Sequence, residues 1–117
     1  MEFIVEGIKY DLRPEEGGAF VIANDYKGDI SIPASVIVDG LPISVVGVAE
    51  DAFYACDDLT SVTLPKGLRI IEKSAFESMS SLTEIVIPTS IEFIGKCAFC
   101  DCDNLQKVVL PSGLKYL

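Results

Sequence analysis

The chain has 117 residues, which suits a single domain with a substantial core and is too short for two. Half of the residues are hydrophobic and the formal net charge is −9, so the composition indicates a globular protein and argues against a nucleic-acid partner or an anionic membrane surface. No apolar run approaches the ~18 residues of a membrane span, and no signal peptide follows Met1. We therefore expect a neutral or cationic partner, no membrane insertion, and a cytoplasmic location if Met1 is the native start.

The N-terminal part of the chain consists of short β-prone runs separated by glycine-bearing turns. Over residues 1–33 this pattern predicts an antiparallel meander. The Asp39-Gly40 pair stands between two apolar runs and predicts a hairpin that leads into the rest of the chain. We interpret residues 1–44 as an N-terminal antiparallel β cap and residues 45–117 as repeated coils of the same domain.

Three later segments, residues 56–65, 79–88 and 102–111, carry one pattern at an offset of 23 residues. Each segment has a leucine at the same place, aliphatic residues at alternating strand positions and a closing proline, and an Ala-Phe pair precedes each of them. The aligned columns are Leu59/Leu82/Leu105, Val62/Ile85/Val108, Leu64/Ile87/Leu110, Pro65/Pro88/Pro111 and Phe53/Phe76/Phe99. A fixed period of this length predicts stacked coils, that is, a solenoid.

Within one repeat, the spacing of Leu59, Val62 and Leu64 predicts a short strand with these side chains inward. A second short extended segment over residues 67–71 should point Leu68 and Ile71 inward. Residues 73–78 are then expected to form a helical or 3-10 turn whose Ala-Phe pair packs on the core. The predicted fold is therefore mainly β, with short helical or 3-10 turns, built as a solenoid of 23-residue repeats.

The pattern Ile-Pro-x-Ser-Ile-x-x-Ile-Gly-x-x-Ala-Phe-x-x-Cys-x-x-Leu, from Ile87 to Leu105, resembles the BspA-like leucine-rich repeat family. The resemblance is strong over residues 30–117 and loose over 1–29. It implies a leucine-rich repeat solenoid that acts as a non-enzymatic protein-interaction or adhesion module, commonly displayed or secreted by gut and oral bacteria. The partner would be a protein or polymer, and the location the cell surface or the exterior. An alternative is that the chain is the cap and first coils of a longer array.

No catalytic, cofactor-binding or metal-binding set stands out in the sequence. Histidine is absent, which removes the usual general base and the commonest zinc ligand. The acidic residues at 57–58 and 101–103 lack the glycine and the closing glutamate of a calcium loop. We therefore expect no enzyme activity, cofactor or metal.

The four cysteines divide into two pairs. Cys56 and Cys102 share an inward column and are expected to be core residues. Cys97 and Cys100 align with polar, outward positions and form a Cys-x-x-Cys pair, so a thiol-redox protein is the alternative function. For this second pair, free thiols are favoured over a local disulfide, and a disulfide over a metal site.

Three outward columns are the candidate contacts for a partner. Two lie on one strand face, and the third becomes more aromatic down the stack, as an apolar contact strip would. Alternatively, the third column only covers the neighbouring coil. The columns are Ser61/Glu84/Lys107, Thr63/Val86/Val109 and Ile70/Phe93/Tyr116.

The C-terminal coil is the candidate site of self-association. Leu114 and Leu117 occupy the columns of Ile91 and Ile94, so the sequence ends partway through a coil and leaves a strand edge uncovered. We expect a homodimer joined end to end through residues from about 97 to 117.

Overall fold

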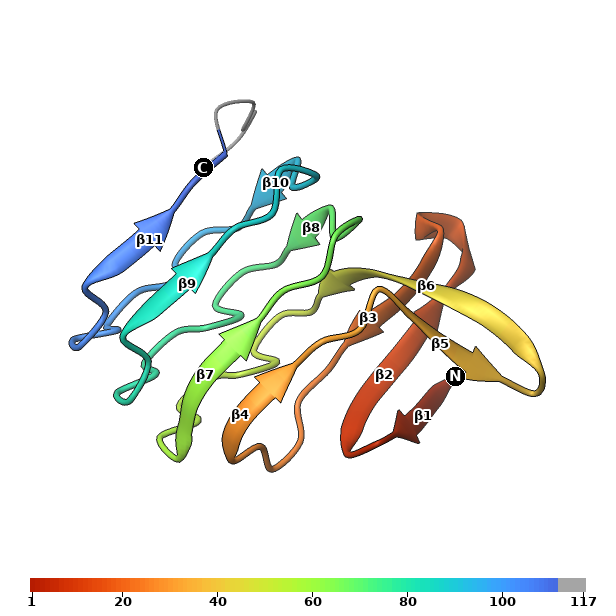
Figure 1. Ribbon diagram of the computed structural model, residues 1–117, viewed down its shortest axis with the longest axis horizontal. Helices are drawn as coiled ribbons and strands as arrows, with labels where there is room; N and C mark the ends of the chain where they lie inside the picture. The colour runs from red at the N-terminus through yellow and green to blue at the C-terminus, as the bar shows by residue number, and fades with distance from the viewer. Residues whose placement is uncertain (112–117) are drawn as a thin grey trace.

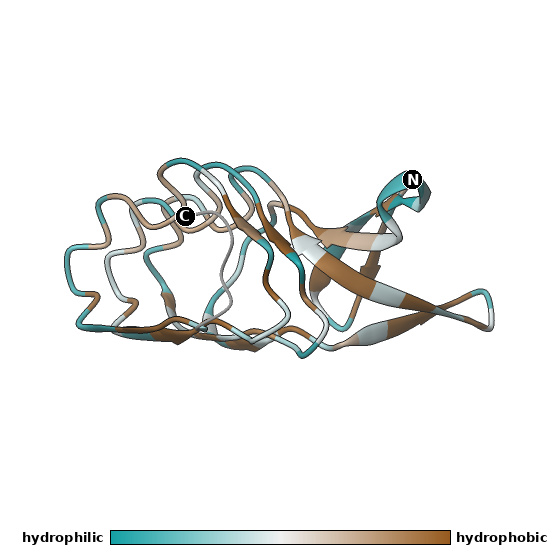
Figure 2. Cartoon of the chain, turned by 90° about the horizontal axis from the view of Figure 1, so that it is seen from above, coloured by the Kyte–Doolittle hydropathy of each residue, from teal (hydrophilic) through white to brown (hydrophobic). Residues whose placement is uncertain are grey.

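The computed structural model describes residues 1–111, which form a stack of short strands and turns next to an N-terminal meander (Figure 1). The strands are β1 (Glu2–Val5), β2 (Ile8–Arg13), β3 (Gly18–Val21), β4 (Gly28–Ser31), β5 (Ser35–Val38), β6 (Leu41–Val48), β7 (Leu59–Thr63), β8 (Ile70–Ile71), β9 (Glu84–Val86), β10 (Phe93–Ile94) and β11 (Lys107–Val109). One 3-10 helix, η1 (Pro14–Glu16), joins β2 to β3. Figure 2 shows that the hydrophobic segments run along the strands of the stack.

The cap predicted over the first residues is an antiparallel meander of β1, β2 and β3, followed later by the β5–β6 hairpin. Asp39 and Gly40 form the hairpin turn with φ values of 51° and 79°. Two consecutive positive φ values match the twist of the flanking strands in a type I′ turn. The predicted hairpin is therefore confirmed.

The coils are joined by parallel strand pairs. The order β3-β6-β8-β10 forms one ladder, while β4 pairs with β7 and β9 pairs with β11 on the other side of each coil. The prediction of an antiparallel meander over residues 1–33 is therefore wrong for residues 28–31. These residues form β4, which pairs in parallel with β7, a strand about 30 residues later in the chain. The division at residues 44 and 45 stays a prediction.

The expectation of a helical or 3-10 turn over residues 73–78 holds only as single turns closed by i→i−3 hydrogen bonds, because no helix forms there. Ser74 and Ser78 have φ values of 58° and 60°, which end any helical run. The N–H groups of Ser74, Phe76 and Ser78 donate to the next coil, at 3.1, 2.8 and 2.8 Å, and those of Ala75 and Glu77 close turns inside their own coil. Because every second N–H is used between coils, none of these segments can complete the hydrogen bonds of a helix.

The turn of the preceding coil, over residues 51–55, repeats this arrangement of hydrogen bonds. The N–H groups of Phe53 and Ala55 donate to the carbonyls of Ala75 and Glu77, at 2.8 and 2.9 Å. The N–H of Tyr54, between them, closes a turn onto Asp51. The 23-residue step therefore has a hydrogen-bonding basis in the turns as well as in the strands.

The core follows the predicted columns. Phe53 and Phe76 are fully buried and stack with ring centroids 5.1 Å apart, and Phe76 stacks on Phe99 at 5.2 Å. Leu59, Val62, Leu68 and Ile71 are all buried, as the repeat spacing predicts. Offset stacking of rings at this separation adds to the burial energy of each one.

The cap is fastened to the coils by Arg13. Its Nη1 atom lies 3.2 and 3.1 Å from the two carboxylate oxygens of Glu72, and its guanidinium lies 4.1 Å from the centre of the Phe20 ring. Burial alone would lower the pKa of Arg13, but its hydrogen bonds and charge pairing, chiefly with Glu72, raise the pKa overall. Glu72 also accepts a hydrogen bond from the N–H of Glu50 at 3.1 Å, so one carboxylate connects the meander with two coils.

Replacing Phe76 with alanine should cost about 3–5 kcal/mol of unfolding free energy, because it leaves a cavity in the middle of the aromatic stack. Phe93→Ala, at a side chain that is 43% exposed, is the matched control and should cost much less. Chemical denaturation of both variants measures the difference. Equal losses would place Phe93 in the core and contradict the assignment of columns.

Candidate interaction face

The outer surface of β7, β9 and β11 brings two of the predicted contact columns together. The register of β9 and β11 places Glu84 beside Lys107 and Val86 beside Val109. Val86 is 57% exposed and Val109 is 41% exposed. The exposure of Val86 follows from the two-residue period of a strand, because the preceding residue Ile85 is buried. On β11 all three residues are exposed, Val108 between Lys107 and Val109 included.

Thr63 continues this surface on β7 and is also exposed. The coils that contain β7 and β9 are paired through β8 and β10, and Ser90 adds a side-chain bridge between them. The Ser90 hydroxyl donates to the carbonyl of Leu68 at 2.6 Å and accepts from the N–H of Gly67 at 3.1 Å. We name the surface formed by Thr63, Glu84, Val86, Lys107 and Val109 the ladder face.

A hollow of about 450 Å³ adjoins the ladder face. Val86, Val109 and Leu110 form part of its apolar lining, and Lys66 also lines it. Leu110 is 45% exposed. Exposed aliphatic side chains around a concavity are typical of a contact surface. The sequence reasoning identified the two valines but not Lys66 or Ser90, which stand outside the strand columns.

The third predicted column is only partly an exposed strip. Ile70 is half-buried and packs against Phe20, Val46 and Ala49. This contact matches the alternative interpretation, in which the column covers a neighbouring coil. Phe93 is 43% exposed, and Tyr116 lies outside the described residues. A contact role for this column stays a prediction.

Cys97 and Cys100 form a disulfide with their Cα atoms 4.7 Å apart, so the expectation of free thiols is wrong. The reason is local: Cys97 has a φ of 56°, and the N–H of Cys100 closes a turn onto the carbonyl of Cys97 at 3.2 Å. This tight turn brings the two cysteines within the separation that a disulfide requires. The column alignment described only which positions face outward, not how close they are within the turn.

Cys56 and Cys102 are free cysteines that pack against the hydrophobic core, where the sequence predicted them to be core residues. Both are half-buried rather than fully buried. Burial raises the pKa of each thiol, and the thiol of Cys102 also donates to the carbonyl of Phe76 at 2.9 Å. A raised pKa leaves less thiolate at neutral pH and makes both thiols poor nucleophiles.

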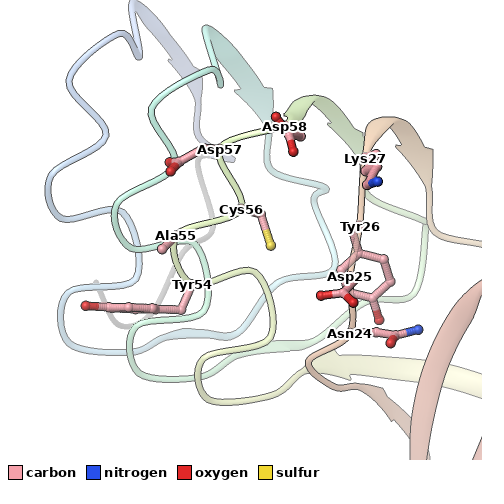
Figure 3. A pocket seen from close by; sticks show the side chains of 9 residues that line it. All are labelled: Asn24, Asp25, Tyr26, Lys27, Tyr54, Ala55, Cys56, Asp57 and Asp58. Carbon is pink, nitrogen blue, oxygen red and sulfur yellow. The ribbon is translucent and has the colours of Figure 1, made fainter.

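Figure 3 shows a second hollow, of about 460 Å³, between the first coil and the segment 24–27. Three carboxylates line it, from Asp25, Asp57 and Asp58, and they stand apart around its rim instead of converging. Asp57 accepts hydrogen bonds from two serines of the next coil, at its side chain and its carbonyl. Across residues 1–111 no group of acidic, cysteine or histidine side chains is arranged to hold a metal ion.

The geometry defines a leucine-rich repeat solenoid with an N-terminal β cap. A family model described as "BspA type Leucine rich repeat region (6 copies)" matches residues 39–117, so the chain belongs to the BspA-type leucine-rich repeat family. This family is generally non-enzymatic and commonly surface-associated in bacteria. Within the described residues no helix is long and apolar enough to cross a membrane.

Solved structures share the fold. A leucine-rich repeat protein from Bacteroides ovatus is 31% identical with a TM-score of 0.88, over 96% of this chain and 30% of that protein. A second one, from Bacteroides capillosus, is 24% identical with a TM-score of 0.65, over 92% and 96% of the two chains. The pneumococcal vaccine antigen PcpA is 23% identical with a TM-score of 0.68, over 99% of this chain and 39% of its own. The last two likenesses concern the fold alone. Among curated proteins none matches.

The chain thus spans less than a third of the length of the Bacteroides ovatus protein. The alternative that it is the first part of a longer array stays open. The predicted homodimer contact, residues from about 97 to 117, lies partly outside the described residues and also stays a prediction. Within the described part, Val108 and Leu110 are 40% and 45% exposed.

A thiol titration tests the cysteine assignments. Without reductant, the native protein should show two slowly reacting thiols at pH 8, Cys56 and Cys102, because their raised pKa values keep them protonated. Mild reduction should release two further thiols that react fast, those of Cys97 and Cys100. The double variant Cys97→Ser/Cys100→Ser should lack these two fast thiols. Four fast thiols before any reduction would contradict both the disulfide and the burial.

Proposed function

We propose that this protein is a non-catalytic interaction or adhesion module that binds a protein or polymer through the ladder face. The observation that carries the proposal is the exposure of Val86 and Val109 side by side, next to a hollow, in a chain whose repeat pattern places most other aliphatic residues inside. Burying such side chains against a partner removes apolar surface from water, and this stabilises the complex.

The chemistry of the surface favours a neutral or cationic partner. The whole chain carries a net charge of −9, which opposes the approach of polyanions. The ladder face itself pairs an acidic residue, Glu84, with a basic one, Lys107, in adjacent strands. A mixed polar rim around an apolar centre is the usual anatomy of a protein interface.

The rigidity of the face supports the same function. β9 and β11 are held in register by parallel pairing, and on β9 the side chain between the two exposed residues, Ile85, is anchored in the core. A surface that is ordered before binding loses little conformational entropy when a partner docks. Because the family is commonly surface-associated in bacteria, we expect such a module to act at the cell surface.

The alternative function is thiol-disulfide exchange by Cys97 and Cys100, and the observation that favours it is their disulfide. Against it, the βαβ setting of thioredoxin-like motifs is missing from residues 1–111, where no α-helix connects one parallel strand to the next. Catalysed reduction of insulin by the parent, lost in Cys97→Ser, would favour this alternative.

The binding proposal is tested with charge substitutions in matched positions. The parent, Val86→Lys, Val109→Lys and Ile37→Lys are applied to immobilised proteins and polysaccharides, neutral and cationic, in a surface binding assay. Ile37 is 63% exposed on the cap and serves as control. A ligand of the parent should bind Val86→Lys and Val109→Lys about tenfold more weakly, since a lysine in a buried contact loses roughly 1.4 kcal/mol or more.

All three variants should keep the parent's unfolding midpoint because the replaced side chains are exposed. If Ile37→Lys weakens binding as much as Val86→Lys does, the contact lies on the cap and the proposal is refuted. Light scattering on each variant separates partner binding from self-association: a parent dimer that Val109→Lys dissociates would assign that residue to a contact between two copies.

A further inference from the structure

Strand β1 lies at one edge of the seven-stranded sheet, and β2 is its single neighbour among the described strands (Figure 1). The N–H of Leu12 donates to the carbonyl of Met1 at 2.9 Å, which makes these two residues a hydrogen-bonded pair of the antiparallel ladder. Such pairs alternate with pairs whose backbone groups point away from the partner strand. By this alternation, Glu2 and Ile4 direct their N–H and C=O groups away from β2, to the free edge.

The backbone of Lys9 on β2 supports this assignment. Lys9 stands opposite Ile4 in the register, and its carbonyl accepts a hydrogen bond from the N–H of Ile22 at 2.9 Å, on the side of β3. Lys9 therefore turns its backbone groups away from β1, as a member of a non-hydrogen-bonded pair does. Ile4 is 61% exposed, so a partner can reach the free edge beside it.

The chain protects a second free edge but leaves this one open. Pro42 of β6 stands opposite Ile37 in the β5–β6 hairpin. The N–H of Val45 donates to the carbonyl of Ala34 at 2.9 Å, so the same alternation places Pro42 at an outward position. A proline there offers no N–H to an added strand. β1 contains no proline and pairs with β2 without a bulge, so its edge keeps both donors and acceptors.

The side chains along the edge of β1 favour a basic partner. Glu2, Ile4 and Glu6 are exposed and stand at alternate positions, so two carboxylates flank one aliphatic side chain. Lys9 lies 3.5 Å from Glu2 and offsets part of its charge, whereas Glu6 has no ion pair among the described residues. A second copy of the chain, with its net charge of −9, would bring like charge to this edge. A strand with basic residues opposite Glu2 and Glu6 is complementary.

A hollow of about 370 Å³ adjoins the end of β1. Val5 and Glu6 line it, together with Ser35 and Ile37 of β5. Successive side chains of an added strand alternate between the two faces of the sheet, so every second one lies on the side of Val5. In recognition by strand addition, backbone hydrogen bonds supply affinity and pockets for alternate side chains supply specificity. This hollow suits an aliphatic side chain of the added strand.

We propose that the free edge of β1 binds an extended segment of a partner protein, which adds an antiparallel strand with basic, aliphatic and basic side chains at alternate positions. The N–H and C=O groups of Ile4 exchange hydrogen bonds with the central residue of that segment. Glu2 and Glu6 face its two basic side chains. This edge shares no residue with the ladder face, so the proposal does not depend on the function proposed for that face.

Synthetic peptides test the charge requirement. The probe is acetyl-Lys-Val-Ile-Val-Lys-amide, and its affinity for the full chain is measured by ligand-observed NMR titration. It should bind about tenfold more tightly than acetyl-Glu-Val-Ile-Val-Glu-amide, because only the second peptide opposes the charges of Glu2 and Glu6. Equal binding of the two peptides, or no binding of the lysine peptide at any soluble concentration, would overturn the proposal.

N-methylation of the lysine peptide separates strand addition from simple charge attraction. In an antiparallel strand centred on Ile4, the N–H of the central isoleucine points at β1, whereas those of the two valines point away. A methyl group on the isoleucine nitrogen should weaken binding about tenfold, equivalent to 1.4 kcal/mol. The same group on a valine nitrogen, the matched control, should change the affinity less than about twofold. Equal effects at the two positions would contradict strand addition.

Ile4→Pro tests the edge from the side of the protein. It removes an N–H that β2 does not use, so the unfolding midpoint should stay close to that of the parent while binding of the lysine peptide is lost. Val86→Lys, on the ladder face, should bind the peptide as the parent does. Unchanged peptide binding by Ile4→Pro, or its loss in Val86→Lys, would place the peptide elsewhere and refute the proposal.

A charge-reversed variant keeps the test independent of any loss of stability in Ile4→Pro. Glu2→Lys combined with Glu6→Lys leaves the backbone of β1 unchanged and should make the glutamate peptide the tighter ligand. A double variant that still prefers the lysine peptide would show that these carboxylates do not select the partner.

Discussion

The structure depends on one constraint: every second backbone N–H of the turns must reach a carbonyl of the next coil. Phe53 and Phe76 occupy equivalent places in this pattern, and their N–H groups both donate at 2.8 Å to an alanine carbonyl one coil further on. The same step stacks their rings at 5.1 Å. Because hydrogen bonds and core packing share one repeat length, an insertion inside a coil would disturb both at once. We propose that function is carried by positions that this constraint leaves free.

Those free positions are the outward residues of the ladders, and the fold turns their sequence spacing into adjacency. Val86 and Val109 are far apart in the chain but neighbours in register, and the same holds for Glu84 and Lys107. In the ladders of such a solenoid, outward side chains line up in rows instead of converging on one point. The cap is different, because there residues of the β1–β2 region, of β4 and of β5 line one hollow.

The sequence predicted what periodicity controls and missed what depends on distance. The buried columns and the Asp39-Gly40 hairpin are as expected, since both follow from local spacing and turn chemistry. The parallel pairing of residues 28–31 was missed, because an alternating pattern does not tell which strand will be the neighbour. The disulfide of Cys97 and Cys100 was missed because it depends on a positive φ that a non-glycine residue rarely adopts. The hollows arise from residues distant in the chain, which no single stretch reveals.

Native-state hydrogen exchange tests the central constraint most directly. The N–H groups of Phe53, Ala55, Phe76 and Ser78 donate to the next coil, whereas those of Tyr54 and Glu77 only close turns within their own. The account predicts an alternating pattern, in which the first four amides exchange through global unfolding and the other two exchange faster through local opening. Consecutive protection through residues 74–78, as in a helix, or uniformly fast exchange of all six amides, would contradict it.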